Sequence, residues 1–263
     1  MLAGMEHENT HPGERMRSLI ASVEAHLTRL KEDGVTTVEV DPDTVRAWSE
    51  TASASPESPP QPIPEPAKGE SPVSDPLDAI ARRVASCQLC RLCETRNRTV
   101  PGQGAPNPDI MFIGEGPGAD EDKQGLAFVG RAGQLLTKII TAMGYEREDV
   151  WIGNIVKCRP PNNRVPTPDE MAACMPYLKE QIALLKPKVI VCLGATAVKG
   201  LFDTQTGITK LRGQWMTFEE IDTMPTYHPA YLLRNPPAKR DVWEDMKEVL
   251  RKLGRPVPEK SKT

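Results

Sequence analysis

The chain has 263 residues, enough for one domain of about 150 to 200 residues and an additional segment. Its net charge of −3 hides an asymmetry, because residues 1–75 hold 6 basic against 14 acidic side chains and residues 76–263 hold 27 against 22. A net −8 followed by a net +5 permits a polyanionic partner without requiring one. The absence of a basic–apolar leader and of a long apolar run predicts a soluble, cytoplasmic protein without a membrane partner.

The N-terminal part predicts an appendage on a linker. Apolar residues recur at helical spacing over 13–32, a β-prone piece follows over 35–40, and a helical turn is expected over 44–48. Residues 51–76 contain eight prolines and almost no apolar side chains, which is typical of a flexible, disordered linker. We expect the appendage to dock another protein or aid solubility. The predicted domains are an N-terminal helical appendage (1–50), a Pro-rich linker (51–76), a main domain (77–255) and a C-terminal tail (256–263).

The main domain is organised around residues 109–136, which predict a strand, a loop and a helix. The apolar strand ends at GEGPG, residues 114–118, whose glycines let the backbone approach a ligand or adopt positive φ. Glu115 at the strand end supplies a hydrogen-bonding group, and Phe128 supplies a flat apolar face. The segment therefore predicts a site for a planar ligand with polar edges.

Apolar strands and helices alternate through the rest of the domain. This alternation predicts a three-layer α/β/α fold with a central, mostly parallel four-stranded sheet. Ligands of such folds bind beyond the carboxyl ends of the strands, so we expect one crevice to collect Glu115, Asn154 and His228. Further strands are predicted over 150–156 and 188–194, and 215–218 and 224–227 are the last strand candidates. Further helices are predicted over 78–86, 167–185, 195–202 and 239–253.

Six cysteines lie in the main domain, and four have a spacing typical of a metal centre. The four are Cys87, Cys90, Cys158 and Cys174, in the pattern C-x2-C, 67 intervening residues, C-x15-C. Four thiolates suit tetrahedral zinc or an iron–sulfur cluster, and the spacing does not choose between them. The alternative is a redox-active or accidental C-x-x-C with the distant cysteines as core fillers. Cys192 is expected in the core, and Cys93 is a possible substitute for Cys90.

Three long, ordered motifs accompany the cysteine pattern. They are GEGPGADED..G.AFVGRAGQLL from residue 114, N.VKCRPP from 154 and HPAYLLR from 228. Together with the cysteines they closely resemble the family 4 uracil-DNA glycosylases, over about residues 76–253. The resemblance implies base excision repair of uracil-containing DNA, a [4Fe–4S] cluster on the four cysteines, and a nucleoid-associated location; we expect a monomer. Ala127 departs from the family, where many members have proline, and Cys93 adds a fifth thiol.

The resemblance implies roles for three pocket side chains. Phe128 carries the flipped uracil, Asn154 reads the O4 and N3–H edge, and His228 donates to O2 as negative charge develops. Without the resemblance, these residues have ordinary interpretations: a core phenylalanine, a strand-end cap and a structural histidine. His228 is the only histidine after residue 26, so any imidazole chemistry in the main domain depends on it.

The resemblance also implies that Glu115 and the backbone of Gly116 place the water and the sugar. Glu121 and Asn163 are the further candidates for orienting the water. The neighbouring Asp120 and Asp122 are expected to be solvated.

Leu232 and Leu233, followed by Arg234, predict an exposed wedge that enters the duplex where the base has left. The alternative is an apolar loop packed on its own domain. Basic side chains near the motifs are expected to contact phosphates and so make activity depend on salt. They are Lys157, Arg159, Arg164 and Arg131.

Other classes of protein fit less well. A base deaminase needs an H-x-E segment before P-C-x-x-C, and a nucleotide-phosphate loop needs a G-K-[ST] ending; the chain has neither. The remaining alternative is a non-catalytic iron–sulfur DNA-binding relative associated with a DNA polymerase. The presence of Glu115, Phe128, Asn154 and His228 together argues for the enzyme.

Overall fold

The computed structural model describes residues 76–258. The predictions for the helix over 13–32, the β-prone piece over 35–40, the turn over 44–48, the linker up to residue 75 and the end of the tail lie outside the described residues. No helix within residues 76–258 is long and apolar enough to cross a membrane.

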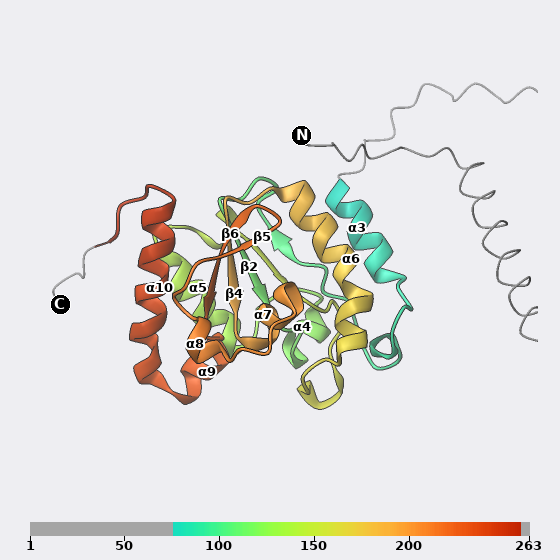
Figure 1. Ribbon diagram of the computed structural model, residues 1–263. Helices are drawn as coiled ribbons and strands as arrows, with labels where there is room; N and C mark the ends of the chain where they lie inside the picture. The colour runs from blue at the N-terminus through green and yellow to red at the C-terminus, as the bar shows by residue number, and fades with distance from the viewer. Residues whose placement is uncertain (1–75, 259–263) are drawn as a thin grey trace, which may run out of the picture. The chain divides into compact units, whose positions relative to one another are not determined.

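One sheet forms the middle layer, with the strand order β1-β3-β2-β4-β6-β5 (Figure 1). The four inner strands are parallel and the two edge strands are antiparallel, as expected for a mostly parallel sheet. The strands are β1 (Gln103–Gly104), β2 (Ile110–Gly114), β3 (Trp151–Asn154), β4 (Val189–Leu193), β5 (Met216–Phe218) and β6 (Ile221–Thr226).

The predicted number of four strands is wrong, because the sheet has six. β1 has only two residues and therefore no alternation that a sequence pattern could reveal. β5 and β6 form a hairpin whose turn residues, Glu219 and Glu220, have φ values of 46° and 68°. Glutamate is an uncommon residue at such positions, so the turn carries no Asn-Gly or Asp-Gly signal.

Helices cover both faces of the sheet, which confirms the three-layer prediction. In Figure 1, α10 and α5 lie on the left of the sheet and α6 and α3 on the right. The α-helices are α3 (Pro76–Ala85), α4 (Ala119–Gln124), α5 (Arg131–Ala142), α6 (Pro168–Leu185), α7 (Ala195–Phe202), α8 (Ile208–Leu211), α9 (Pro229–Arg234) and α10 (Lys239–Lys252). Short 3-10 turns occupy Arg91–Glu94, Arg147–Asp149, Pro161–Asn163 and Pro236–Ala238.

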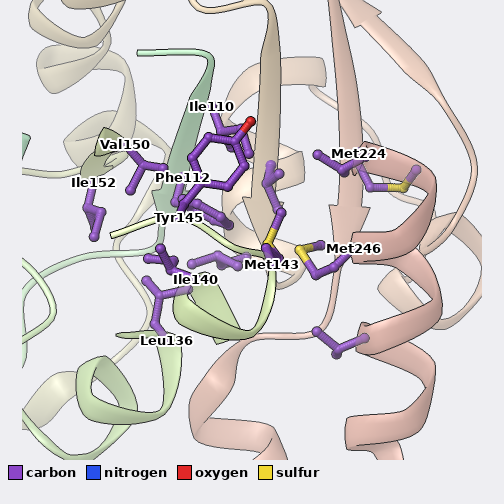
Figure 2. Close-up of a cluster of buried hydrophobic side chains, with 14 of the residues drawn as sticks. Ile110, Phe112, Leu136, Ile140, Met143, Tyr145, Val150, Ile152, Met224 and Met246 are labelled. Carbon is purple, nitrogen blue, oxygen red and sulfur yellow. The ribbon is translucent and has the colours of Figure 1, made fainter. Parts of the chain in front are cut away.

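The central strand β2 divides the core into two clusters. Phe112 and Ile110 point to the side of α5 and α10, where Ile140 and Met246 pack with them (Figure 2). The alternate residues of β2, Met111 and Ile113, face the cluster that α6 and α7 cover. Because both faces are buried, all five β2 residues are apolar or glycine. This packing fixes where each strand ends, and so fixes the floor of the pocket described below.

Candidate active site and thiol pocket

A pocket with a volume of about 490 Å³ lies beyond the carboxyl ends of β2 and β3 and beside the start of α9. The predicted meeting of Glu115, Asn154 and His228 in one crevice is confirmed, since all three line it. The predicted site residues that line the pocket are Glu115, Gly116, Glu121, Phe128, Asn154, Asn163, His228 and Arg234.

The Phe128 ring forms one wall of this pocket. Its centroid lies 5.6 Å from that of the His228 ring, and the planes are inclined by 35°. The ring fits because Gly114 lacks a side chain: a Cβ there would lie 2.5 Å from Phe128 Cζ and 2.6 Å from Asn154 Oδ1. Gly133 similarly admits the Phe128 backbone, whose φ is 52°. A clash-free pocket wall therefore depends on two glycines.

Asn154 ends β3 opposite Gly114 of β2. Its side chain is almost fully buried, and Oδ1 has no hydrogen-bond partner among the described residues. A buried polar atom left unpaired costs about 1–3 kcal/mol. A ligand N–H in the pocket would remove this cost.

His228 follows β6 and caps the N-terminus of α9. Its Nδ1 accepts the backbone N–H of Ala230 at 3.1 Å, so a neutral imidazole carries its hydrogen on Nε2. Burial, and to a smaller extent the charge of Arg234, lowers the pKa of His228 to about 4. The site thus holds a neutral imidazole that can donate one hydrogen bond at neutral pH.

Glu115 is held by a residue that the sequence analysis missed. The hydroxyl of Thr196, in the first turn of α7, donates to Glu115 Oε2 at 2.5 Å. Thr196 follows the end of β4, so the strand-end argument that selected Glu115 would also have found it. The contact fixes one carboxylate oxygen beside the pocket.

Glu121 anchors the Phe128 loop. Its carboxylate accepts the backbone N–H groups of Gly118 at 3.1 Å and of Val129 and Gly130 at 2.9 Å each. The bonds from Val129 and Gly130 tie α4 to the loop that carries Phe128, and the bond from Gly118 caps α4 itself. A role of Glu121 in orienting water stays a prediction, as does that of Asn163, whose Oδ1 accepts from Arg159 Nε at 2.8 Å.

Two predictions for charged residues are wrong. Asp122 is fully buried rather than solvated, and its carboxylate accepts from the side chain and backbone of Asn97 and from the backbone of Arg98. Lys157 is 1% exposed and its Nζ bonds within the domain, so it does not contact phosphates. Both residues are paired in the interior, which only tertiary structure reveals.

The other basic residues predicted to contact phosphates differ in how exposed they are and in whether they already have a protein partner. Arg164 forms an ion pair with Glu170 and lines the pocket, whereas Arg131 is exposed at the start of α5. Arg159 is half-buried.

The predicted wedge is wrong for Leu232, which is fully buried. The segment forms helix α9, so neighbouring side chains point about 100° apart and only some face outward. Leu233 is 38% exposed and Tyr231 is 37% exposed. Tyr231 also lines the pocket, a placement the sequence analysis did not anticipate.

A second pocket is lined by five cysteines. They are Cys87, Cys90, Cys93, Cys158 and Cys174. They come from three segments: the loop after α3, the exit of β3, and α6. Cys192 is fully buried in β4, as predicted.

Nitrogen donors surround two of these sulfurs. Arg96 Nη1 lies 3.1 Å from Cys158 Sγ, and the backbone N–H of Lys157 lies 3.2 Å from Cys174 Sγ. Burial raises the pKa of the Cys158 and Cys174 thiols, the latter to about 11. Within residues 76–258, no three His, Cys, Asp or Glu side chains form a group suited to a single metal ion. A thiol set with N–H donors around it suits a centre bound by several thiolates.

The fold and the site define an α/β protein that has a pocket with polar and aromatic lining residues at the carboxyl edge of its sheet, and a second pocket lined by thiols. The family model described as the uracil DNA glycosylase superfamily matches residues 101–247. The chain belongs to the uracil-DNA glycosylase superfamily.

Three similar proteins are type-4 uracil-DNA glycosylases. The protein of Sulfurisphaera tokodaii is 48% identical, with the alignment covering 66% of this chain and 84% of that protein. That of Saccharolobus solfataricus is 47% identical, over 66% and 85%. That of Thermotoga maritima is 47% identical, over 66% and 92%. The resemblance inferred from the motifs is confirmed.

Proposed function

We propose that this protein is a DNA repair glycosylase that flips uracil out of DNA and hydrolyses its N-glycosidic bond, leaving an abasic site. The observation that carries the proposal is the unpaired Oδ1 of Asn154, a residue that lines the same pocket as the Phe128 ring and the neutral imidazole of His228. Asn154 matches the polar edge of uracil, Phe128 matches its flat face, and His228 matches the negative charge that develops on the base as it departs.

Asn154 selects the base. In this proposal, Oδ1 accepts from uracil N3–H while the amide nitrogen donates to O4. Cytosine presents an acceptor at N3 and a donor at C4, the opposite pattern. The Phe128 ring, 6% exposed, supplies the apolar face on which the flipped base stacks.

His228 and Glu115 act on the reaction itself. As the bond to the sugar breaks, uracil leaves with negative charge that the Nε2–H of His228 stabilises at O2; a single such donor contributes about 3 to 4 kcal/mol. Glu115, held by Thr196, orients the water that attacks the sugar. The backbone of Gly116 lies beside it in the pocket and contacts the sugar.

Side chains at the rim of the pocket contact the DNA around the flipped nucleotide. We assign the wedge to Leu233 in place of Leu232, because Leu233 is the exposed leucine of α9. Arg234 and Arg164 line the pocket and contact phosphates next to the flipped nucleotide.

The thiol pocket is proposed to hold a [4Fe–4S] cluster on Cys87, Cys90, Cys158 and Cys174, with Cys93 as a fifth thiol. When bound, the cluster supplies a covalent tie between the loop after α3, the exit of β3, and α6. Purified protein is expected to contain iron and to absorb near ~400 nm. Zinc in place of iron would overturn this assignment.

We further propose that residues 77–255 form a monomeric glycosylase domain. Deleting residues 1–75 should then leave uracil excision intact. Loss of folding or activity in that truncation would contradict this division.

The proposed function is tested by measuring free uracil released from a labelled oligonucleotide. The wild-type protein should release uracil but no cytosine, and His228→Ala and Asn154→Ala should lower the rate strongly. Absence of release by an iron-loaded wild-type protein would overturn the proposal and favour a DNA-binding role without catalysis.

A further inference from the structure

A buried lysine connects the two pockets. Lys157 lies between Asn154, which reads the base, and Cys158, which lines the thiol pocket. Its Nζ donates to the backbone oxygen of Asn154 at 3.0 Å and to Gln181 Oε1 at 2.7 Å. Gln181 Nε2 in turn donates to the backbone oxygen of Pro101 at 2.8 Å.

This ammonium group has no anionic protein partner. Both of its acceptors are neutral, and no carboxylate among residues 76–258 forms an ion pair with it. A buried charge without a counter-charge is costly by several kcal/mol. Among the described residues, the ionisable group whose charge acts on the Lys157 ammonium is Cys174, and its Sγ lies 3.2 Å from the Lys157 backbone nitrogen.

A second cation faces the same pocket. The Arg96 guanidinium contacts Cys158 Sγ through Nη1, and its Nη2 donates to the Ala85 carbonyl at 3.1 Å. Four thiolates around an iron–sulfur core of formal charge +2 leave a net charge of about −2. One buried ammonium and one guanidinium balance that charge.

We propose that Lys157 is the buried counter-charge of the thiol-bound centre and, through its bond to the Asn154 carbonyl, ties that centre to the strand end that reads uracil. The proposal rests on the cofactor assigned above. It makes Lys157 a positioning residue with an electrostatic effect on the centre, because the reduction potential of a cluster depends on nearby charge and hydrogen bonds.

Three variants separate charge from packing. Lys157→Met removes the charge and both hydrogen bonds. Gln181→Glu keeps an acceptor for Nζ but neutralises the ammonium with a carboxylate. Gln181→Met is the matched control, because it removes the acceptor and leaves the charge.

The readouts are iron per chain, absorbance near ~400 nm and the midpoint potential of the cluster. Lys157→Met and Gln181→Glu should both shift the potential to more negative values and speed loss of iron in air, while Gln181→Met stays near the wild-type potential. If Lys157→Met fails to fold, the comparison of the two Gln181 variants decides.

Unchanged potentials in iron-loaded Lys157→Met or Gln181→Glu would overturn the inference and leave the glycosylase and its cluster standing. A wild-type protein without iron would instead overturn the cofactor assignment, and this inference with it. A Gln181→Met shift as large as that of Gln181→Glu would show a packing effect and contradict the electrostatic one.

Discussion

The pocket beyond the ends of β2 and β3, here called the base pocket, and the thiol pocket lined by five cysteines are built in different ways. Protein hydrogen bonds already fix the base pocket: Thr196 holds Glu115, three backbone N–H groups hold Glu121, and Ala230 sets the tautomer of His228. The thiol pocket gathers cysteines from three separate segments, and burial raises the pKa of its Cys158 and Cys174 thiols. The fold alone organises the first site, whereas burial in the second site disfavours deprotonated sulfurs, a cost that the cluster proposed above would offset.

The largest expected effect concerns the base pocket alone. His228→Ala should lower the single-turnover rate of uracil release about 10²- to 10³-fold, because it removes one donor to the departing base. Iron content should stay unchanged, since His228 lies outside the thiol pocket. Lys210→Ala, on the short helix α8, serves as a control with wild-type rate. Loss of iron in His228→Ala would show that the two pockets are not separable.

Gly114→Ala should close the base pocket while leaving the sheet in place. The added Cβ would meet the Phe128 ring and Asn154 Oδ1 at 2.5 and 2.6 Å, so we expect kcat/KM to fall about 100-fold, a loss of about 3 kcal/mol in transition-state binding. Gly144→Ala is the matched control: its φ is +83° but nothing lies within 4 Å. It should cost only about 1 kcal/mol in the free energy of unfolding. Equal kinetic effects of the two variants would refute the steric argument.

Cys174→Ser should act on the thiol pocket first. Iron per chain is expected to fall about tenfold or more, because one of the four thiolates proposed to hold the cluster is lost, and the thermal midpoint should fall with it. Cys192→Ala is the matched control, because this thiol is buried in β4 away from the other five. Metal analysis and a thermal melt measure both effects. Wild-type iron content in Cys174→Ser would mean that Cys93 or another thiol completes the centre.

Thr196→Val should have a smaller effect on catalysis. It removes the hydroxyl that donates to Glu115, and a hydrogen bond to a charged group contributes about 1.5–3 kcal/mol. We expect kcat to fall about tenfold with KM little changed, as measured in steady-state assays. Thr196→Ser, which keeps the hydroxyl, should retain most of the rate. A rise in KM alone would indicate that Thr196 serves binding rather than the orientation of Glu115.

The smallest effect on activity is expected from pH. Because burial lowers the pKa of His228 from its ordinary value of 6.5 to about 4, its imidazole stays neutral and catalysis should show no histidine titration between about pH 7 and 5. The free energy of unfolding does depend on pH. In the unfolded chain the His228 imidazole binds a proton below about pH 6.5, whereas in the folded chain it binds one only below about pH 4. Lowering the pH from 7 to 5 should therefore cost the wild type about 2 kcal/mol more than His228→Ala in urea unfolding. A rate that falls with an apparent pKa near 6.5 would contradict the buried neutral imidazole.

The sequence located the base pocket because strand ends are visible in apolar patterns. Glu115, Asn154 and His228 each follow a buried strand, and a parallel sheet brings such positions together. The same argument applied to β4 would have supplied Thr196. The two-residue edge strand β1 left no pattern to detect, and the Glu219-Glu220 turn carries no signal that would join the candidate strands 215–218 and 224–227 into a hairpin.

The errors share one physical cause. Whether a charged or apolar side chain is buried depends on contacts far along the chain: Asp122 bonds to residues 97 and 98, and Lys157 bonds to Gln181. Leu232 turned inward because its segment is a helix whose phase is set by packing against α5. A local sequence pattern gives no information about these long-range contacts.

The central claim is that the pocket at the strand ends holds uracil between Phe128, Asn154 and His228. A crystal structure of the protein with free uracil tests this most directly. We predict that the ring is stacked on Phe128, that N3–H is bonded to Asn154 Oδ1, and that O2 faces His228 Nε2. Uracil bound elsewhere, or with its O2 turned away from His228, would contradict it.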